Sequence, residues 1–172
     1  MELPEPRWPR LFSTRFVCTV ATLGPIGARL PAPGTWGSLA GLGYFVLVFR
    51  HARWEVIFAW TVLLSYFAVA FCGDAARRMG RTDPGEVNLD EFVVMPLVFL
   101  GWRAGYAASL PEWVGLLAGF GLFRFYDILK PLGIARLQSW PGGWGIVVDD
   151  FVAALAACGT LHLGAALWVW LR

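Results

Sequence analysis

The sequence predicts an all-α, polytopic helical membrane protein with about four to five membrane-embedded helices, some of them short or re-entrant. Of its 172 residues, 58% are hydrophobic and only 15% are charged, whereas about a quarter of the residues in an ordinary soluble domain are charged. The chain also contains apolar runs of about twenty residues, the length of helix that crosses the hydrocarbon core of a bilayer. These observations exclude a typical soluble protein and predict one integral membrane domain over residues 1–172.

Three segments carry the simplest predictions. Residues 1–22 are basic and lack an apolar core long enough for a cleavable signal, so the N-terminus is expected to stay in the cytoplasm. The uncharged run Thr35 to Phe49 predicts a short first span, and Trp54 to Gly73 predicts a full one because its length matches the bilayer core. Phe151 to Leu171 (151–171) is uncharged and predicts the last membrane helix.

The middle of the chain is less regular. Phe92 to Trp102 is apolar, but a helix of that length rises only about 16 Å and cannot cross a bilayer alone. We expect it to pair with Glu112 to Phe123 as a hairpin that returns the chain to the side it left. The sequence leaves open whether this hairpin, Phe92 to Phe123, spans the membrane or re-enters it.

Counting these crossings from a cytoplasmic N-terminus places three polar segments at one membrane face: Pro31 to Ser38, Asp74 to Glu91 and Arg124 to Asp150. Cytoplasmic segments of membrane proteins are enriched in Lys and Arg. Of the 14 basic residues, all lie on the expected cytoplasmic side except Arg50, Arg53, Arg103 and Arg172. The distribution therefore supports a cytoplasmic polar face.

Most acidic residues lie in the same segments. Clustered carboxylates beside apolar helices require a neutralising cation, and oxygen ligands suit Mg2+ rather than zinc. Both histidines, His51 and His162, lie in other segments. The acids of these segments are Asp74, Asp83, Glu86, Asp90, Glu91, Asp127, Asp149 and Asp150.

Each acid also has a structural interpretation. Asn88 with Glu91 fits a capping box that opens the Phe92 helix, and Asp83 fits a turn. Asp149 and Asp150 would favour the N-terminus of the last helix electrostatically. The adjacent acids nevertheless raise each other's pKa unless a metal neutralises them, so the cluster as a whole favours a metal site.

Two further patterns have paired interpretations. Arg124, Asp127 and Lys130 follow at i, i+3 and i+6 on one helix face, as either an exposed ion-paired stripe or ligands for phosphate and metal. Thr35 and Ser38 open the first span. There they could hold a phosphate oxygen at the helix N-terminus or simply begin a helix.

Other classes of function fit less well. The chain has no basic block that could follow a nucleic-acid backbone, so we expect no nucleic-acid partner. Cys72 and Arg78 match the C-x5-R spacing of cysteine phosphatases, but an acid, Asp74, lies where phosphate would bind, and we treat the match as coincidental. A small membrane transporter or a scaffold with a structural acidic cluster remains the alternative, although a transporter would place its charges in mid-span.

Four segments together resemble the phosphatidylglycerophosphatase A family over residues 23–155. They are Pro31 to Leu39, Asp83 to Glu91, Phe123 to Pro131 and Gly142 to Asp150. The resemblance implies a bacterial inner-membrane, Mg2+-dependent phosphatase that removes the terminal phosphate of phosphatidylglycerophosphate to give phosphatidylglycerol. The chain departs from the family pattern at Asn88, Gly133 and Gln138, which bears on substrate fine-tuning rather than on the reaction.

The expected roles follow from the chemistry of a phosphomonoester dianion, whose charge must be neutralised before a nucleophile can attack in line. We expect Arg124 and Lys130 to bind the phosphate and act in catalysis, together with Thr35 and Ser38 as phosphate ligands. Glu91 or Asp83 is the expected base. The expected metal ligands are Asp90, Asp127, Asp149 and Asp150.

Overall fold

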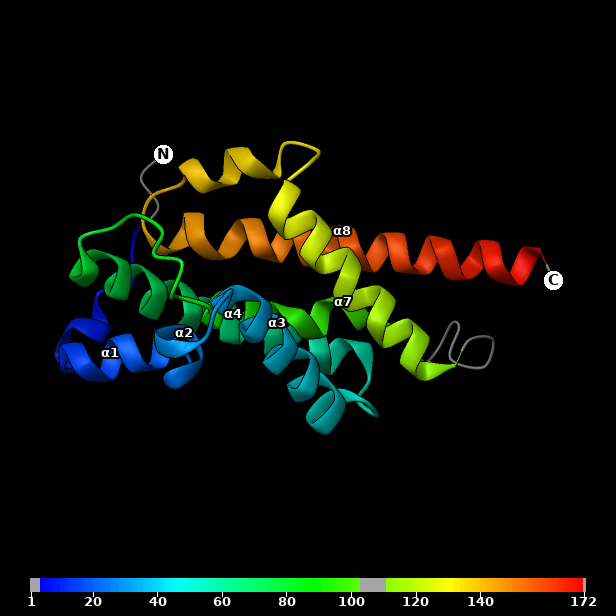
Figure 1. Cartoon of the computed structure of the whole chain (residues 1–172), viewed down its shortest axis with the longest axis horizontal. Helices are drawn as coiled ribbons and strands as arrows, with labels where there is room; N and C mark the ends of the chain where they lie inside the picture. The colour runs from blue at the N-terminus through cyan, green and yellow to red at the C-terminus, as the bar shows by residue number, and fades with distance from the viewer. Residues whose placement is uncertain (1–3, 103–110, 172) are drawn as a thin grey trace.

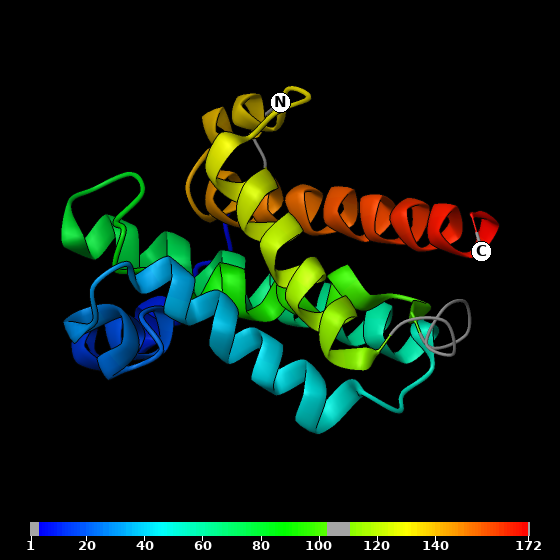
Figure 2. The same cartoon turned by 45° about the vertical axis from the view of Figure 1, so that its right-hand side comes forward.

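The computed structural model describes residues 4–102 and 111–171, and every regular element in that part of the chain is helical. This confirms the all-α prediction. Figures 1 and 2 show short helices at the N-terminal end and two long helices, α4 and α8. The elements are η1 (Trp8–Leu11), α1 (Thr14–Ala21), α2 (Pro25–Arg29), α3 (Pro33–Tyr44), η2 (Phe45–Phe49), α4 (Trp54–Met79), α5 (Leu89–Val94), η3 (Met95–Phe99), α7 (Glu112–Leu129), η4 (Ile134–Ser139) and α8 (Gly143–Trp170).

Helices α4 and α8 are the two that are long and apolar enough to cross a membrane, judged over the described residues. With 26 and 28 residues, they rise about 39 and 42 Å. Helix α4 begins at Trp54 as predicted but continues past Gly73, and Gly80 ends it with a left-handed φ of 68°. Helix α8 begins at Gly143, eight residues before the predicted start at Phe151. Both helices therefore extend beyond their apolar runs into the polar segments.

The apolar surface of these two helices agrees with a lipid environment. Large apolar side chains remain more than 40% exposed along both helices, whereas a soluble monomer rarely leaves such continuous apolar surface open to water. The exposed side chains include Trp54, Val56, Phe58, Trp60, Leu63 and Phe67 of α4 and Leu163, Leu167, Trp168 and Trp170 of α8. This surface fits membrane association.

The other predicted spans form shorter pieces. Thr35 to Phe49 is divided between α3 and the π-helical turn η2, and the start of the Phe92 to Trp102 run is divided between α5 and η3. The run is therefore not one continuous helix. The segment predicted to pair with it, Glu112 to Phe123, lies in α7, which contacts η3 and continues six residues beyond Phe123. Four to five membrane-embedded helices remain a prediction.

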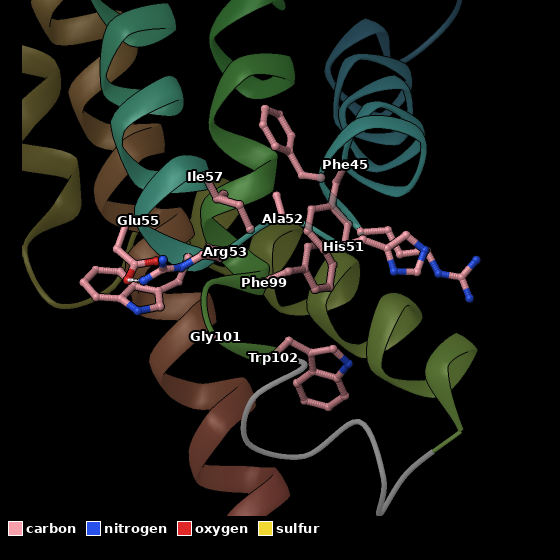
Figure 3. Close-up of a pocket in the computed structure, with 12 residues that line it drawn as sticks. Phe45, His51, Ala52, Arg53, Glu55, Ile57, Phe99, Gly101 and Trp102 are labelled. Atoms are coloured by element: carbon pink, nitrogen blue, oxygen red, sulfur yellow. Dashed lines mark hydrogen bonds and ion pairs between the residues drawn. The ribbon is translucent and has the colours of Figure 1, made fainter.

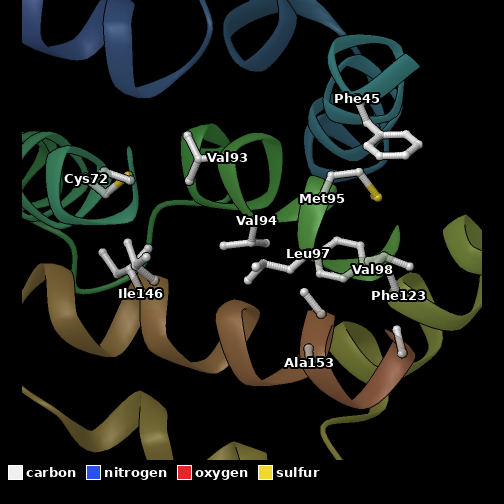
Figure 4. Close-up of a cluster of buried hydrophobic side chains, with 14 of the residues drawn as sticks. Phe45, Cys72, Val93, Val94, Met95, Leu97, Val98, Phe123, Ile146 and Ala153 are labelled. Atoms are coloured by element: carbon white, nitrogen blue, oxygen red, sulfur yellow. The ribbon is translucent and has the colours of Figure 1, made fainter. Parts of the chain in front are cut away.

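Elements α5 and η3 form the centre of the apolar core (Figure 4). Val94, Met95, Leu97 and Val98 are fully buried where α5 and η3 pack against α3, α4, α7 and α8. Burial on all sides explains why this run is apolar without the length of a membrane span. It also fixes α5, which carries two of the predicted acids at its start.

Glycines allow the helices to approach closely around this core. Along α3, a Cβ atom on Gly37 would lie 2.8 Å from Asn88 Cβ, and one on Gly41 would lie 2.7 Å from the Phe92 carbonyl oxygen. At the crossing of α4 and α8, a Cβ atom on Gly143 would lie 1.9 Å from the Val69 carbonyl oxygen. Larger residues would separate these helices and the polar groups that they carry.

Candidate active site

A cavity of about 240 Å³ brings most of the predicted site residues together. Its walls come from the start of α3, the loop before α5, α5 itself, the end of α7 and the first turns of α8. Among the ten predicted residues, the eight that line the cavity are Asp83, Asp90, Glu91, Arg124, Asp127, Lys130, Asp149 and Asp150. Residues up to 67 positions apart in the sequence therefore meet at one site.

The guanidinium of Arg124 connects three elements on one side of the cavity. Its Nη1 lies 2.9 Å from Glu91 Oε2, 2.7 Å from Asp127 Oδ2 and 3.1 Å from Ser38 Oγ. The Ser38 hydroxyl lies 2.6 Å from Glu91 Oε2 and 2.8 Å from the Gly34 carbonyl oxygen, so it can donate to one of them at a time. A cation with two carboxylates leaves this part of the site with a net negative charge.

Lys130 also lines the cavity and lies immediately after α7. It ends that helix in the left-handed conformation, with φ 45°, and its ammonium group donates to Asp149 Oδ2. Burial lowers the pKa of Lys130, but the hydrogen bond to Asp149 and the charges of Asp149, Asp150 and Asp127 outweigh this effect, so the pKa is raised. Lys130 therefore stays protonated and presents positive charge to the cavity.

Asp90 is one of the buried acids of the cavity. Its side chain is buried, and its Oδ1 has no hydrogen-bond partner among the described residues. Burial raises the pKa of Asp90 well above its ordinary value, and the charges of Glu91, Asp83 and Asp149 raise it further. Asp149 Oδ1 is likewise buried without a hydrogen-bond partner in the described part of the chain. Two buried carboxylate oxygens of this anionic cavity are therefore left without a donor among the described residues.

The donor set matches Mg2+ in kind, because hard carboxylate oxygens are its usual protein ligands. In the described residues, however, no group of three or more His, Cys, Asp and Glu side chains is arranged to hold a metal ion. Basic side chains hold two of the four predicted ligands, since Asp127 pairs with Arg124 and Asp149 pairs with Lys130. Metal binding would require these carboxylates to exchange partners.

The structure corrects two structural interpretations of the acids. Asn88 precedes α5 but forms no side-chain capping bond; its Nδ2 instead donates to the Pro33 carbonyl oxygen at 3.1 Å, and Glu91 turns toward Ser38 and Arg124. The capping box is therefore wrong. Asp149 and Asp150 do not precede the last helix either, because α8 begins at Gly143 and places both inside it.

The remaining predicted residues differ in position. Ser38 is buried behind Glu91 and Arg124 rather than on the cavity wall. Thr35 is exposed and does not line the cavity, so its role as a phosphate ligand remains a prediction. Asp83 is exposed, whereas Asp90, Asp149 and Asp150 are buried, which places Asp83 toward the mouth of the site.

Sequence reasoning missed the contribution of Gly34. A Cβ atom at this position would lie 2.1 Å from Glu91 Oε1, so only glycine lets the start of α3 close against the Glu91 carboxylate. Gly34 directly precedes Thr35 in the segment whose hydroxyls were predicted to bind phosphate. A glycine at the start of a helix suggests a close approach, but the sequence does not show that α5 brings the Glu91 carboxylate to this position.

A second cavity, of about 320 Å³, lies at the other end of α4 (Figure 3). Its lining includes Arg50, Arg53, Glu55, Phe99 and Trp102. Arg53 pairs there with Glu55 at 2.7 Å, and Arg50 pairs with Glu112. None of the predicted site residues lines this cavity, so it does not compete with the acidic cavity as the candidate active site.

Comparison with known proteins matches most of the chain to one family. A family model described as phosphatidylglycerophosphatase A matches residues 19–165. The chain is 37% identical to a Haemophilus influenzae protein named phosphatidylglycerophosphatase A over 130 residues, 74% of this chain and 75% of that protein. It is 32% identical to the Escherichia coli protein of the same name over 137 residues, 79% of this chain and 76% of that protein.

A third relative carries a different name. A Bacteroides thetaiotaomicron protein, provisionally named a phosphatidylinositol-3-phosphatase, is 31% identical over 144 residues, 80% of this chain and 85% of that protein. No solved structure matches this chain. Because the family match covers most of the chain and includes every residue that lines the acidic cavity, the chain belongs to the phosphatidylglycerophosphatase A family and is a lipid phosphatase.

Proposed function

We propose that this protein hydrolyses the terminal phosphomonoester of phosphatidylglycerophosphate to phosphatidylglycerol and phosphate, in an Mg2+-dependent reaction in glycerophospholipid biosynthesis. The acidic cavity carries the proposal, because it joins Arg124 and Lys130 to a set of carboxylates at one point. The names of the Haemophilus and Escherichia relatives support the substrate.

Arg124 and Lys130 would bind the phosphomonoester. Both side chains line the cavity and are less than a fifth exposed, and partial burial strengthens their attraction for a dianion. Arg124 offers a planar set of donors, while Lys130 acts as a point charge. Both cations pair with carboxylates in the structure. A bound phosphate would therefore compete with Glu91, Asp127 and Asp149 for the N–H donors of the two basic side chains.

Asp90, Asp127, Asp149 and Asp150 would hold Mg2+. Support comes from the unsatisfied oxygens of Asp90 and Asp149 and from the excess of negative charge in the cavity. The ion would supply positive charge to the transferring phosphoryl group and lower the pKa of a water molecule. Its charge would also reduce the electrostatic repulsion between Asp90 and Glu91 in α5 and between Asp149 and Asp150 in α8.

The reaction transfers the phosphoryl group to water. A new P–O bond forms to the attacking oxygen, the bond between phosphorus and the glycerol oxygen breaks, and that oxygen leaves with a proton. Glu91 or Asp83 would accept the proton of the attacking water. Glu91 lies deeper and is fixed by Ser38 and Arg124, whereas Asp83 lies toward the mouth.

The arrangement of α4 and α8 supports an active face at one surface of the bacterial inner membrane. Asp83 follows the C-terminal end of α4, and Asp149 and Asp150 lie near the N-terminal end of α8, so the acidic cavity lies at one end of both candidate spans. The basic residues of the same segments favour the cytoplasmic side. A transporter or scaffold is not favoured, because these charges lie at the helix ends rather than in mid-span.

Phosphate release from the purified, detergent-solubilised protein tests the proposal. We expect turnover of phosphatidylglycerophosphate with Mg2+, loss of turnover in EDTA, and recovery when Mg2+ is added back. Phosphatidylinositol 3-phosphate and phosphatidic acid serve as rival substrates at equal surface concentration. Turnover of either rival at a higher kcat/KM, or full activity in EDTA, would contradict the substrate or the metal respectively.

A further inference from the structure

A larger cavity, of about 660 Å³, adjoins the active site. It lies between the C-terminal end of α4, the N-terminal end of α8 and the N-terminal segment, and it shares Asp83 and Ile146 with the acidic cavity. The two cavities therefore meet at a common wall. A substrate whose phosphomonoester lies beside Arg124 and Lys130 would reach this second cavity with its next few atoms.

Two arginines give the second cavity a cationic character. Arg77 and Arg81 both line it, and their side chains are 44% and 52% exposed. Arg7, Arg10 and Arg78 add positive charge around Arg77. Arg77 pairs with Asp74, and Arg81 pairs with Glu86 at 2.9 Å. The exposed Arg81–Glu86 pair contributes little stability. Asp74 is buried, but it also pairs with Arg78 at 2.7 Å and keeps that partner when Arg77 leaves, so both Arg77 and Arg81 can turn to an incoming anion.

An anion of the protein itself already lies in this cavity. A Cβ atom on Gly142 would lie 1.2 Å from Glu5 Oε1, so the Glu5 carboxylate occupies the space beside Gly142, the residue before α8. The backbone N–H groups and the dipole of a helix N-terminus favour negative charge. Glu5 also acts electrostatically on Arg77. The cavity thus holds a carboxylate between an arginine and the start of a long helix.

We propose that this cavity binds the phosphodiester of the lipid substrate and that Glu5 takes its position in the free enzyme. The inference rests on the proposed function, because phosphatidylglycerophosphate carries a phosphodiester and a phosphomonoester joined by one glycerol unit. That short bridge matches two cavities with a common wall at Asp83 and Ile146. Arg81 and Arg77 are then specificity-determining residues, and the bound lipid displaces Glu5.

Product inhibition separates the two cavities. Phosphatidylglycerol retains only the phosphodiester, whereas inorganic phosphate resembles only the group that leaves. In nonionic detergent, Arg81→Gln should raise the inhibition constant of phosphatidylglycerol and the KM of phosphatidylglycerophosphate at least fivefold. It should leave the inhibition constant of phosphate and kcat within twofold. Arg77→Gln should act in the same direction, while Glu5→Gln should lower both lipid constants because a competing anion is removed.

Arg136→Gln is the matched control, since Arg136 is an exposed cation that lines neither cavity. Equal losses of lipid affinity in Arg136→Gln and Arg81→Gln would overturn the inference in favour of general attraction between the protein and anionic lipid. A rise in the inhibition constant of phosphate in Arg81→Gln would also overturn it, because the cavity would then bind the leaving phosphate. An active Arg81→Gln enzyme with an unchanged KM for phosphatidylglycerophosphate and an unchanged inhibition constant for phosphatidylglycerol would overturn the inference alone. Wild-type protein that fails to hydrolyse phosphatidylglycerophosphate would instead contradict the proposed function.

Discussion

Arg124 Nη1 donates to Glu91 Oε2 at 2.9 Å and thereby joins the end of α7 to the start of α5 across 33 sequence positions. Both side chains are largely buried, and Asp127 lies on the same guanidinium. Removing one partner of a buried ion pair leaves the other charge uncompensated. This contact therefore fixes α5 against α7 and positions the Arg124 guanidinium to bind phosphate.

Arg124→Gln should nearly abolish activity and also destabilise the protein. Glu91 and Asp127 would then repel each other without a cation between them, a cost of about 3 kcal/mol for a broken buried pair. Arg124→Lys keeps the charge but loses the fork of donors, so we expect a folded protein with strongly reduced kcat. Phosphate release and the thermal transition in detergent measure the two effects. Wild-type kcat in Arg124→Lys would contradict a role in phosphate binding.

Gly34→Ala should reduce activity sharply, because the new Cβ atom would lie 2.1 Å from Glu91 Oε1. The start of α3 or the Glu91 carboxylate must then move, and the Arg124 contact moves with it. Gly43→Ala is the matched control on the same helix, since a Cβ atom there meets nothing within 4 Å. Similar activity losses in both variants would show that helix α3 tolerates no added methyl group and would contradict a local effect at Glu91.

The extent to which the site could be predicted follows from these contacts. Residue types and spacing gave the acids and their basic partners, because clustered charge beside apolar helices is itself unusual. The two long helices followed from their apolar runs. The buried elements α5 and η3 could not be resolved, since an apolar run surrounded by protein has the same composition as a short span. The close approach of Gly34 to Glu91 depends on packing between elements that no local pattern describes.

Mg2+ should stabilise the protein, and Asp90 should be required for that effect. Burial raises the pKa of Asp90, so the folded state binds its proton more tightly than the unfolded state does. The metal-free protein should therefore lose stability as pH rises above the unfolded value of about 3.9. Asp90→Asn should weaken this loss, remove the rise in melting temperature caused by Mg2+, and abolish turnover. An unchanged Mg2+ effect in Asp90→Asn would contradict its role as a ligand.

Activity should not depend on thiols. Cys72 is completely buried in the core, where its sulfur packs as a small apolar group and cannot reach a substrate. Cys72→Ala should retain near-normal kcat with a modest loss of stability, about 1 kcal/mol for a small cavity. A variant that also lacks Cys18 and Cys158 should retain near-normal kcat as well. An inactive but folded Cys72→Ala variant would restore the cysteine-phosphatase interpretation that the C-x5-R spacing raised.

The last prediction concerns the membrane face on which the cavity lies. Arg81 is an exposed residue that lines the larger cavity, and Arg136 is an exposed residue of η4 that lines neither cavity. His51 lies at the other end of α4. In a cysteine-free protein in intact cells, single cysteines at Arg81 and Arg136 should react only with membrane-permeant reagents, whereas a cysteine at His51 should also react with impermeant reagent added outside. Labelling after the cells are lysed shows that each position is reactive. Impermeant labelling of Arg81 and Arg136 but not His51 would invert the orientation and place the phosphatase on the outer face. Because the cavity joins α5, α7 and α8, labelling of Arg81 and Arg136 from opposite sides would contradict the fold itself.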